Sequence, residues 1–373
     1  MSGPASADDA PALIAERLLQ VIDEGRRTAT YKLALLMALI DACASNADES
    51  GRAPAALHTR EIARHVLRLY LPHARGYLAA GRSVPLQLRQ ITNKNSAVLG
   101  AVLRLHLVGE ASGNRSFASL ERHHSDEVGR CLDDVERTFA RYPLRLLQVV
   151  GNEHRPFLYD IDWTESVSLA ALHADGGGIL RFRPGAGDEL TRLAPLLRPL
   201  IELHWLRMVA SLNDLDLEGE RLRAHLFGTN RVGFPPALRS GLRDLQDGRC
   251  FYCDDLLTGS SEVDHFIPWS RWHNDAIENL VLADRCNNHK RDHLAAADHA
   301  RRWAHRLVVD SADLDAIATT ARWSAEPDRT LAIGRSSYFH LPAGTPLWVL
   351  GGSFIDDDPR RIAAAMAAPQ SAG

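Results

Sequence analysis

Apolar residues recur at intervals of three and four through the first part of the chain, as they do on one face of an α-helix. This periodicity predicts helices over residues 11–24, about 28–44, 59–71 and 124–142. The segment 32–44 (KLALLMALIDACA) is apolar on most sides, so its helix is expected to be buried. Helices are therefore expected to dominate this part of the chain.

A different pattern follows in the middle of the chain. Residues 156–163 and 179–183 are rich in apolar and aromatic side chains, which favours two short β-strands that pair as a hairpin. A long amphipathic helix is predicted over 188–213, and two further helices over 294–307 and 312–322. The pattern as a whole predicts a mainly helical protein with a minor β component.

The composition is that of a globular protein without a membrane anchor. Its 373 residues are enough for two or three domains, and 45% of them are hydrophobic. No stretch is long and apolar enough for a membrane helix, and the N-terminus lacks the segments of a secretory signal, so a cytoplasmic location is expected. The net charge of −4 counts mildly against tight nonspecific binding of nucleic acid, because phosphate contacts rely on lysine and arginine.

Residues 250–293 carry the most informative chemistry of the chain. Their key polar side chains follow one another in the order Cys250, Cys253, Asp264, His265, Asn279 and Cys286. An imidazole can take a proton from water at neutral pH, because its ordinary pKa lies near 6.5. A carboxylate oxygen is a ligand that hard divalent cations prefer. His265 is therefore the candidate general base, and Asp264 is a candidate metal ligand.

This order and spacing resemble the HNH (ββα-metal) endonucleases over about 45 residues. The resemblance implies a small ββα module that hydrolyses phosphodiester bonds of DNA with a divalent ion, Mg²⁺ or Mn²⁺, and it leaves RNA open as a substrate. It also implies that Asn279 braces the loop between the two strands. In the family pattern CNxxK the residue after the cysteine binds the catalytic ion, which favours Asn287. An alignment with the HNH domain of RNA-guided CRISPR nucleases favours Asn288 instead, and His289 would restore the third letter of HNH.

The same stretch raises the question of a structural zinc site on Cys250, Cys253 and Cys286. Many family members carry two CxxC pairs and bind zinc through four thiolates. Here one cysteine remains of the second pair, with Asp284 two residues before it and His289 three residues after it. If His289 completes a Cys₃His zinc site, Asn287 must hold the catalytic ion. The alternative is three packed thiols without a metal, and the fourth zinc ligand stays open.

Two further features point to contacts with nucleic acid. Lys290 and Arg291 follow the metal site by one turn, where the phosphate backbone is expected to run. The segment 87–105 fits the second helix of a helix-turn-helix or winged-helix domain, with Arg89 and residues 93–95 (Asn, Lys, Asn) facing DNA. The same segment fits a plain helical bundle equally well.

These patterns predict an α+β, mainly helical protein with four regions. They are a helical N-terminal region for DNA binding or sensing (1–150), a hairpin and long helix as connector (151–232), the HNH module near the C-terminal third (233–295), and C-terminal helices with a packing tail (296–373).

The expected function is that of a bacterial restriction-like or anti-phage endonuclease, by analogy with where such architectures occur. One alternative is a non-catalytic, zinc-stapled module that binds nucleic acid. Another is a toxin or effector nuclease whose N-terminal region senses a signal. A homodimer would allow both strands of a duplex to be cut.

Overall fold

A computed structural model describes residues 10–23, 29–92, 96–114, 116–150, 153–154, 156–215, 219–228, 233–259 and 261–366. It is mainly helical with several small sheets, as the hydrophobic pattern predicts. None of the helices in these described residues is long and apolar enough to cross a membrane.

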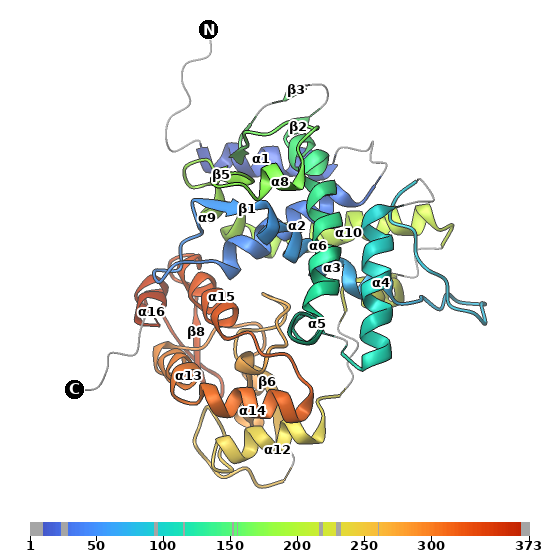
Figure 1. The fold of residues 1–373 in the computed structure, drawn as a ribbon. Helices are drawn as coiled ribbons and strands as arrows, with labels where there is room; N and C mark the ends of the chain where they lie inside the picture. Colours follow the sequence, from blue (N-terminus) through green and yellow to red (C-terminus); the bar gives the residue numbers. More distant parts are fainter. Residues whose placement is uncertain are drawn as a thin grey trace. The chain divides into compact units, whose positions relative to one another are not determined.

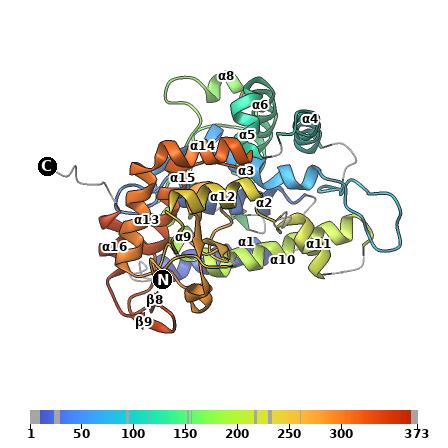
Figure 2. The ribbon, with the colours of Figure 1, turned by 90° about the horizontal axis from the view of Figure 1, so that it is seen from below.

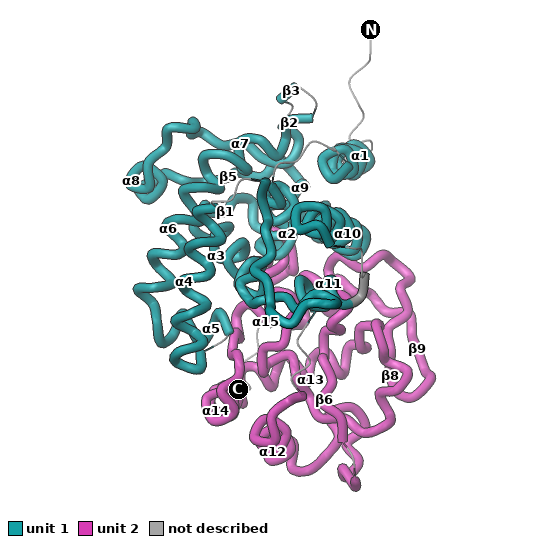
Figure 3. The backbone as a smooth tube through the Cα atoms, turned by 90° about the vertical axis from the view of Figure 1, so that its right-hand side faces the viewer, with its two compact units in different colours: residues 1–43, 54–230 teal, residues 44–53, 231–373 magenta. Residues whose placement is uncertain are grey.

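The contacts between residues divide the chain into two compact units (Figure 3). The first unit comprises residues 1–43 and 54–230, and the second comprises residues 44–53 and 231–373. The longer segment of the second unit begins at residue 231, and the HNH module is expected from residue 233. The further boundary expected at residue 150 falls inside the first unit, because a strand from before that point pairs with a strand from after it.

The first unit is built mainly of helices (Figure 1). They are α1 (Ala10–Asp23), α2 (Tyr31–Ser45), α3 (Thr59–Tyr70), the 3₁₀ helix η2 (Leu71–Ala74), α4 (Ala97–Ser112), α5 (Phe117–His123), α6 (Ser125–Arg141), α7 (Pro143–Leu146), α8 (Leu169–Leu172), α9 (Ala186–Arg192), α10 (Ala194–Leu212) and α11 (Gly219–Leu226). The first four predicted helices correspond to α1, α2, α3 and α6. The predicted long helix over 188–213 is divided into α9 and α10, and Pro195 lies in the first turn of α10, where proline is well tolerated.

The core of this unit is centred on α2. Every side chain from Leu33 to Ile40 is at most 2% exposed, which is the burial that its all-round apolar sequence predicts. A buried hydrogen-bond network also links distant segments. Thr30 bonds the Tyr70 hydroxyl at 2.7 Å and Gln90 at 3.0 Å, and Trp205 Nε1 donates to Gln90 at 2.8 Å.

A three-stranded antiparallel sheet lies in the same unit, in the order β1 (Ala56–His58), β5 (Ile179–Phe182), β4 (Tyr159–Asp160). The pairing of β4 with β5 is the predicted hairpin. A second sheet pairs β2 (Val149–Val150) with β3 (Glu153–His154). Strand β1 was not predicted, because three residues are too few to show a period of two.

The helix-turn-helix interpretation of 87–105 does not match the fold. In such a domain the two helices are joined by a turn of about three or four residues. Here α3 and α4 are separated by η2 and by residues 75–96. Residues 93–95 lie outside the described part of the chain.

The second unit contains the motif stretch and the C-terminal helices. Its elements are α12 (Pro236–Leu245), β6 (Glu262–His265), the 3₁₀ helix η3 (Ile277–Asn279), β7 (Leu280–Ala283), the 3₁₀ helix η4 (Arg285–His289), α13 (Ala297–Val309), α14 (Ser311–Ala321), α15 (Pro327–Phe339), β8 (Leu347–Leu350), β9 (Ser353–Ile355) and α16 (Pro359–Ala365). Helix α12 packs along α14 (Figures 1 and 2). Strand β8 packs inside this unit, where the ring of the buried Trp348 lies 5.0 Å from the Tyr252 ring, centroid to centroid.

The element after β7 is shorter than the α-helix expected of a ββα module. It is the five-residue η4, whose first turn is capped by Asp284: the carboxylate accepts from Cys286 N at 2.7 Å. Arg291 follows with a φ of +42°, a left-handed conformation that ends the helical path. None of the η4 side chains is buried. Apolar burial therefore does not attach η4 to the hairpin, and polar contacts have to do so.

Candidate nuclease site and metal centre

The hairpin of β6 and β7 places the two central residues of the motif at the end of a strand. Asp264 pairs with Val281 and His265 with Leu280, so the motif residues sit on a fixed antiparallel register. Successive side chains of a strand point to opposite faces. The two side chains accordingly have different partners, and each is partly exposed: 23% for Asp264 and 20% for His265.

His265 is paired with a carboxylate that the sequence analysis did not identify. Its Nε2 lies 2.6 Å from Oδ1 of Asp275. The rings of Phe234 and Trp269 lie beside the imidazole, with centroids at 6.0 and 5.5 Å. Asp275 sits ten residues along an irregular loop, so no periodic pattern could relate it to His265. The one available signal was an acid four residues before Asn279.

Asn279 lies fully buried at the base of this loop, which covers residues 266–276. Its Oδ1 accepts from Ile267 N at 2.8 Å, and its Nδ2 donates to Ile267 O at 3.0 Å and Asn274 O at 2.9 Å. Both ends of the amide are therefore used on backbone groups at the two ends of the loop. This geometry is that of a brace, the role that the family resemblance implies.

Lys290 does not lie on the surface, contrary to the expectation that it contacts DNA phosphates. Its side chain is 1% exposed, and its ammonium lies 3.0 Å from Asp264 Oδ2 and donates to His265 O at 2.7 Å. A buried ammonium needs a charged partner, and the spacing in sequence could not show that Asp264 supplies it. Burial lowers the pKa of Lys290, and the Asp264 carboxylate offsets part of that effect. Arg291, the second expected phosphate contact, is exposed.

The Asp264 carboxylate is only partly engaged. Its Oδ2 accepts from the Tyr252 hydroxyl at 2.6 Å and from the Lys290 ammonium. On a 3₁₀ helix, side chains three residues apart lie on the same edge. Asn287 therefore shares an edge with Lys290, whose side chain reaches Asp264, and Lys290 N donates to Asn287 O at 2.8 Å. Asn287 is half-buried, whereas Asn288 and His289 are exposed.

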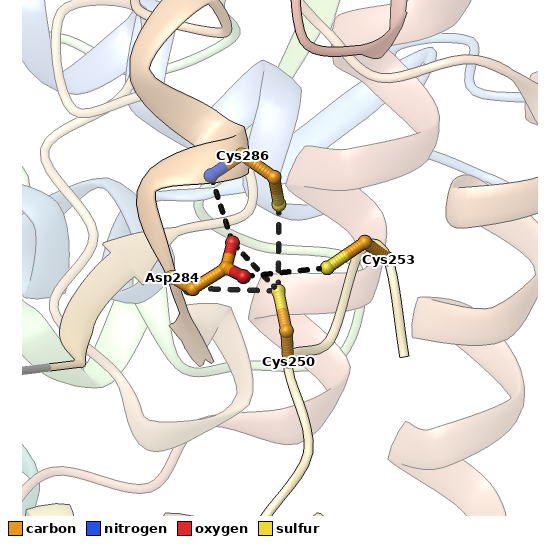
Figure 4. Close-up of side chains that lie close together, drawn as sticks. All are labelled: Cys250, Cys253, Asp284 and Cys286. Atoms are coloured by element: carbon orange, nitrogen blue, oxygen red, sulfur yellow. Dashed lines mark hydrogen bonds between the residues drawn. The ribbon is translucent and has the colours of Figure 1, made fainter. Parts of the chain in front are cut away.

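Four side chains converge at the other end of the hairpin, as Figure 4 shows: Cys250, Cys253, Asp284 and Cys286. One ligand atom from each lies within 4.8 Å of the ligand atoms of the others. The Cys250 and Cys286 sulfurs are 3.5 Å apart, and Cys253 Sγ lies 3.5 Å from Asp284 Oδ2. Among the described residues, this group includes Asp284 and leaves out His289, so the Cys₃His set weighed from the sequence is not the one that the fold assembles.

The chemistry of this cluster suits a metal such as zinc. A hydrogen bond from the Cys286 thiol lowers the pKa of Cys250 to about 6, which favours the thiolate form that binds metals. Hydrogen bonding from Cys286 also holds the pKa of Asp284 below its usual range. Thiolates and carboxylates are both established zinc ligands, and four of them complete a tetrahedral structural site. The donor set therefore fits a structural zinc ion.

Comparison with known families covers both units. Residues 12–226, more than half of the chain, match the family described as Domain of unknown function (DUF8808). The chain belongs to the DUF8808 family. In this DUF8808 protein, residues 248–296 also match the HNH endonuclease family, which confirms the resemblance drawn from the motif. No curated protein and no solved structure matches the chain.

A buried acid on η3 is expected to make the stability of this DUF8808 protein depend on pH. Glu278 is 3% exposed, and its Oε2 accepts from Glu326 N at 3.0 Å. Burial raises the pKa of Glu278 from 4.5 to about 7. Between pH 4.5 and about 7, Glu278 is therefore expected to be protonated in the folded protein and ionised in the unfolded chain. This contribution to stability is complete below pH 4.5 and is lost as the pH rises to about 7.

We expect Glu278→Gln to remove this part of the pH dependence, because the amide is neutral at every pH and still accepts a hydrogen bond. The difference between a pKa of 4.5 and one of about 7 corresponds to at most about 3 kcal/mol of unfolding free energy. Between pH 4.5 and pH 8 the wild type should therefore lose up to that amount of stability relative to the variant. Urea unfolding of both proteins across this range, followed by tryptophan fluorescence, measures the effect. Parallel stability curves for the two proteins would contradict it.

Proposed function

We propose that this protein is a metal-dependent endonuclease that hydrolyses DNA phosphodiester bonds, in a bacterial restriction-like or anti-phage role. The observation that carries the proposal is the position of Asp264 and His265 as neighbours at the end of β6. They lie next to the loop that Asn279 holds, inside the segment that matches the HNH endonucleases. In this arrangement His265 is the general base that takes a proton from the attacking water.

The catalytic ion is proposed to bind Asp264 and Asn287. Asp264 fits because its described hydrogen bonds use Oδ2, which leaves the second carboxylate oxygen for an ion. Asn287 fits because it lies three residues before Lys290, whose ammonium reaches this carboxylate, and because its ligand atom is an amide oxygen. Oxygen donors of this kind suit Mg²⁺ or Mn²⁺, whereas participation of His289 would favour softer ions. When bound, such an ion polarises the phosphate and stabilises the leaving oxygen.

The zinc ion is proposed to be structural, on Cys250, Cys253 and Cys286 with Asp284 as the fourth ligand. It would join the loop at 250–253 to η4, none of whose side chains is fully buried. Small modules of this kind use a metal in place of a hydrophobic core. Holding η4 in place would in turn hold Asn287 and Lys290 against the end of β6.

The nucleic acid is proposed to run past Arg291, which is exposed and directly follows Lys290. One arginine does not supply the affinity of a DNA-binding protein, since each neutralised phosphate adds only one increment to the binding free energy. The DUF8808 unit is therefore proposed to supply further contacts, or to sense the signal that admits DNA to the site.

Plasmid cleavage by the purified protein tests the proposal. Supercoiled DNA should convert to nicked or linear product with Mg²⁺ or Mn²⁺ and stay intact with EDTA. The nicked or linear form reports whether one strand or both are cut, and a parallel RNA substrate reports on nucleic-acid class. If zinc-loaded protein cleaves neither plasmid, modified phage DNA nor RNA, the chain is better explained as a binding module. Phage plating on cells that express the protein tests the defensive role separately.

A further inference from the structure

We propose that Asp275 is the positioning residue for His265: it accepts the hydrogen on Nε2 and so leaves Nδ1 as the nitrogen that takes the proton from water. The inference rests on the proposed nuclease function. It adds an acid from the loop 266–276 to a site that the motif itself builds from Asp264, His265 and Asn287.

The contact itself selects one tautomer of the imidazole. A carboxylate accepts hydrogen bonds and donates none, so the hydrogen in the 2.6 Å contact must be carried by His265 Nε2. In a neutral imidazole the other nitrogen, Nδ1, then holds the free electron pair. The carboxylate also stabilises the imidazolium that forms once Nδ1 has taken a proton.

Hydrogen bonds of the loop hold Asp275 in the place where this contact forms. Its backbone oxygen accepts from Trp323 Nε1 at 2.6 Å, which ties it to the chain after α14. On one side, Asn274 is buried and bonds Thr330 at 3.0 Å and Ala276 N at 3.1 Å. A carboxylate held by anchored neighbours loses little conformational freedom on pairing, unlike two mobile surface side chains.

The division of charge around the site agrees with this role. The buried ammonium of Lys290 is directed to Asp264, the residue that precedes His265 in the motif. Within the described residues, the ion pair of Asp275 is the one with His265, and no arginine or lysine competes for it. The two acids therefore serve different groups, since Asp264 faces the proposed ion and Asp275 faces the base.

Cleavage kinetics of full-length variants test the consequence. Asp275→Asn can turn its NH₂ group toward Nε2 and so favours the tautomer with hydrogen on Nδ1, which cannot act as base. We expect kcat for plasmid nicking to fall about 10- to 100-fold with KM changed less than about twofold. Asp275→Glu keeps a carboxylate and should recover most of the lost rate. Asp313→Asn, the same charge change at an exposed position on α14, is the matched control and should cleave normally.

A spectroscopic measurement separates this inference from the proposed function. The ring nitrogen signals of ¹⁵N-labelled histidine report the tautomer, and His265 is assigned by its absence in His265→Gln. We expect hydrogen on Nε2 in the wild type and in Asp275→Glu, but a shift toward Nδ1 in Asp275→Asn. Hydrogen on Nδ1 in the wild type, or normal cleavage by a folded Asp275→Asn, would overturn the role of Asp275. If the wild type cleaves nothing, the nuclease proposal fails, and the tautomer still decides whether Asp275 orients His265.

Discussion

Replacing His265 with alanine is expected to lower the rate of plasmid cleavage by about 10²- to 10⁴-fold, the range that a general base contributes. The imidazole is the one side chain of the proposed site that can take a proton from water near neutral pH. The fold should survive the change, because the contacts of this residue that hold the site together use its backbone. Lys290 bonds His265 O, and the next residue, Phe266, donates its N–H to Asn279 O at 2.7 Å.

Single-turnover cleavage at saturating Mg²⁺ measures this loss without interference from product release. His305→Ala is a suitable control, since His305 is an exposed histidine on α13 in the same unit. Both variants should keep the zinc content and the circular dichroism of the wild type. Retention of more than about a tenth of the wild-type rate by folded His265→Ala would exclude His265 as the general base.

Loss of the zinc ligands is expected to have the second large effect, on stability rather than on chemistry. The purified protein should contain one zinc ion per chain, and Cys286→Ser should lose it together with several kcal/mol of the stability of the second unit. Structural zinc in small peptides contributes about 10 kcal/mol or more, so even partial loss is measurable. The effect should be large because no apolar side chain of η4 is buried to replace the metal.

Elemental analysis and thermal unfolding with and without a zinc chelator test this expectation. Asp284→Ala and His289→Ala form a matched pair that identifies the fourth ligand. The first should weaken zinc binding, and the second should leave it unchanged, because the fold brings Asp284 to the three sulfurs. If the protein holds no zinc and its unfolding ignores the chelator, the cysteines are packed thiols, and the alternative weighed from the sequence is correct.

The sequence by itself determined the parts of this protein that depend on neighbours along the chain. Helix α2 could be predicted as buried, because a run that is apolar on all sides has no face to expose. The HNH domain could be recognised for a similar reason: its residues occupy fixed places on one short hairpin and the turn after it. The β4–β5 pairing was also predicted from two short apolar runs separated by a turn-rich segment.

Only the tertiary structure decided which polar groups meet. Lys290 stands one turn beyond the motif, and its spacing is the same whether its ammonium faces phosphate or Asp264. Asp284 and His289 flank Cys286 two and three residues away in the sequence, and the turn from β7 into η4 places Asp284 beside the sulfurs. Asp275 reaches His265 across an irregular loop whose shape depends on Asn279 and on contacts from distant helices. The spacing of apolar residues indicates which face of a helix or strand is buried, and it can be read from neighbours along the chain. The direction of a charged side chain is set instead by partners that folding brings from elsewhere in the chain.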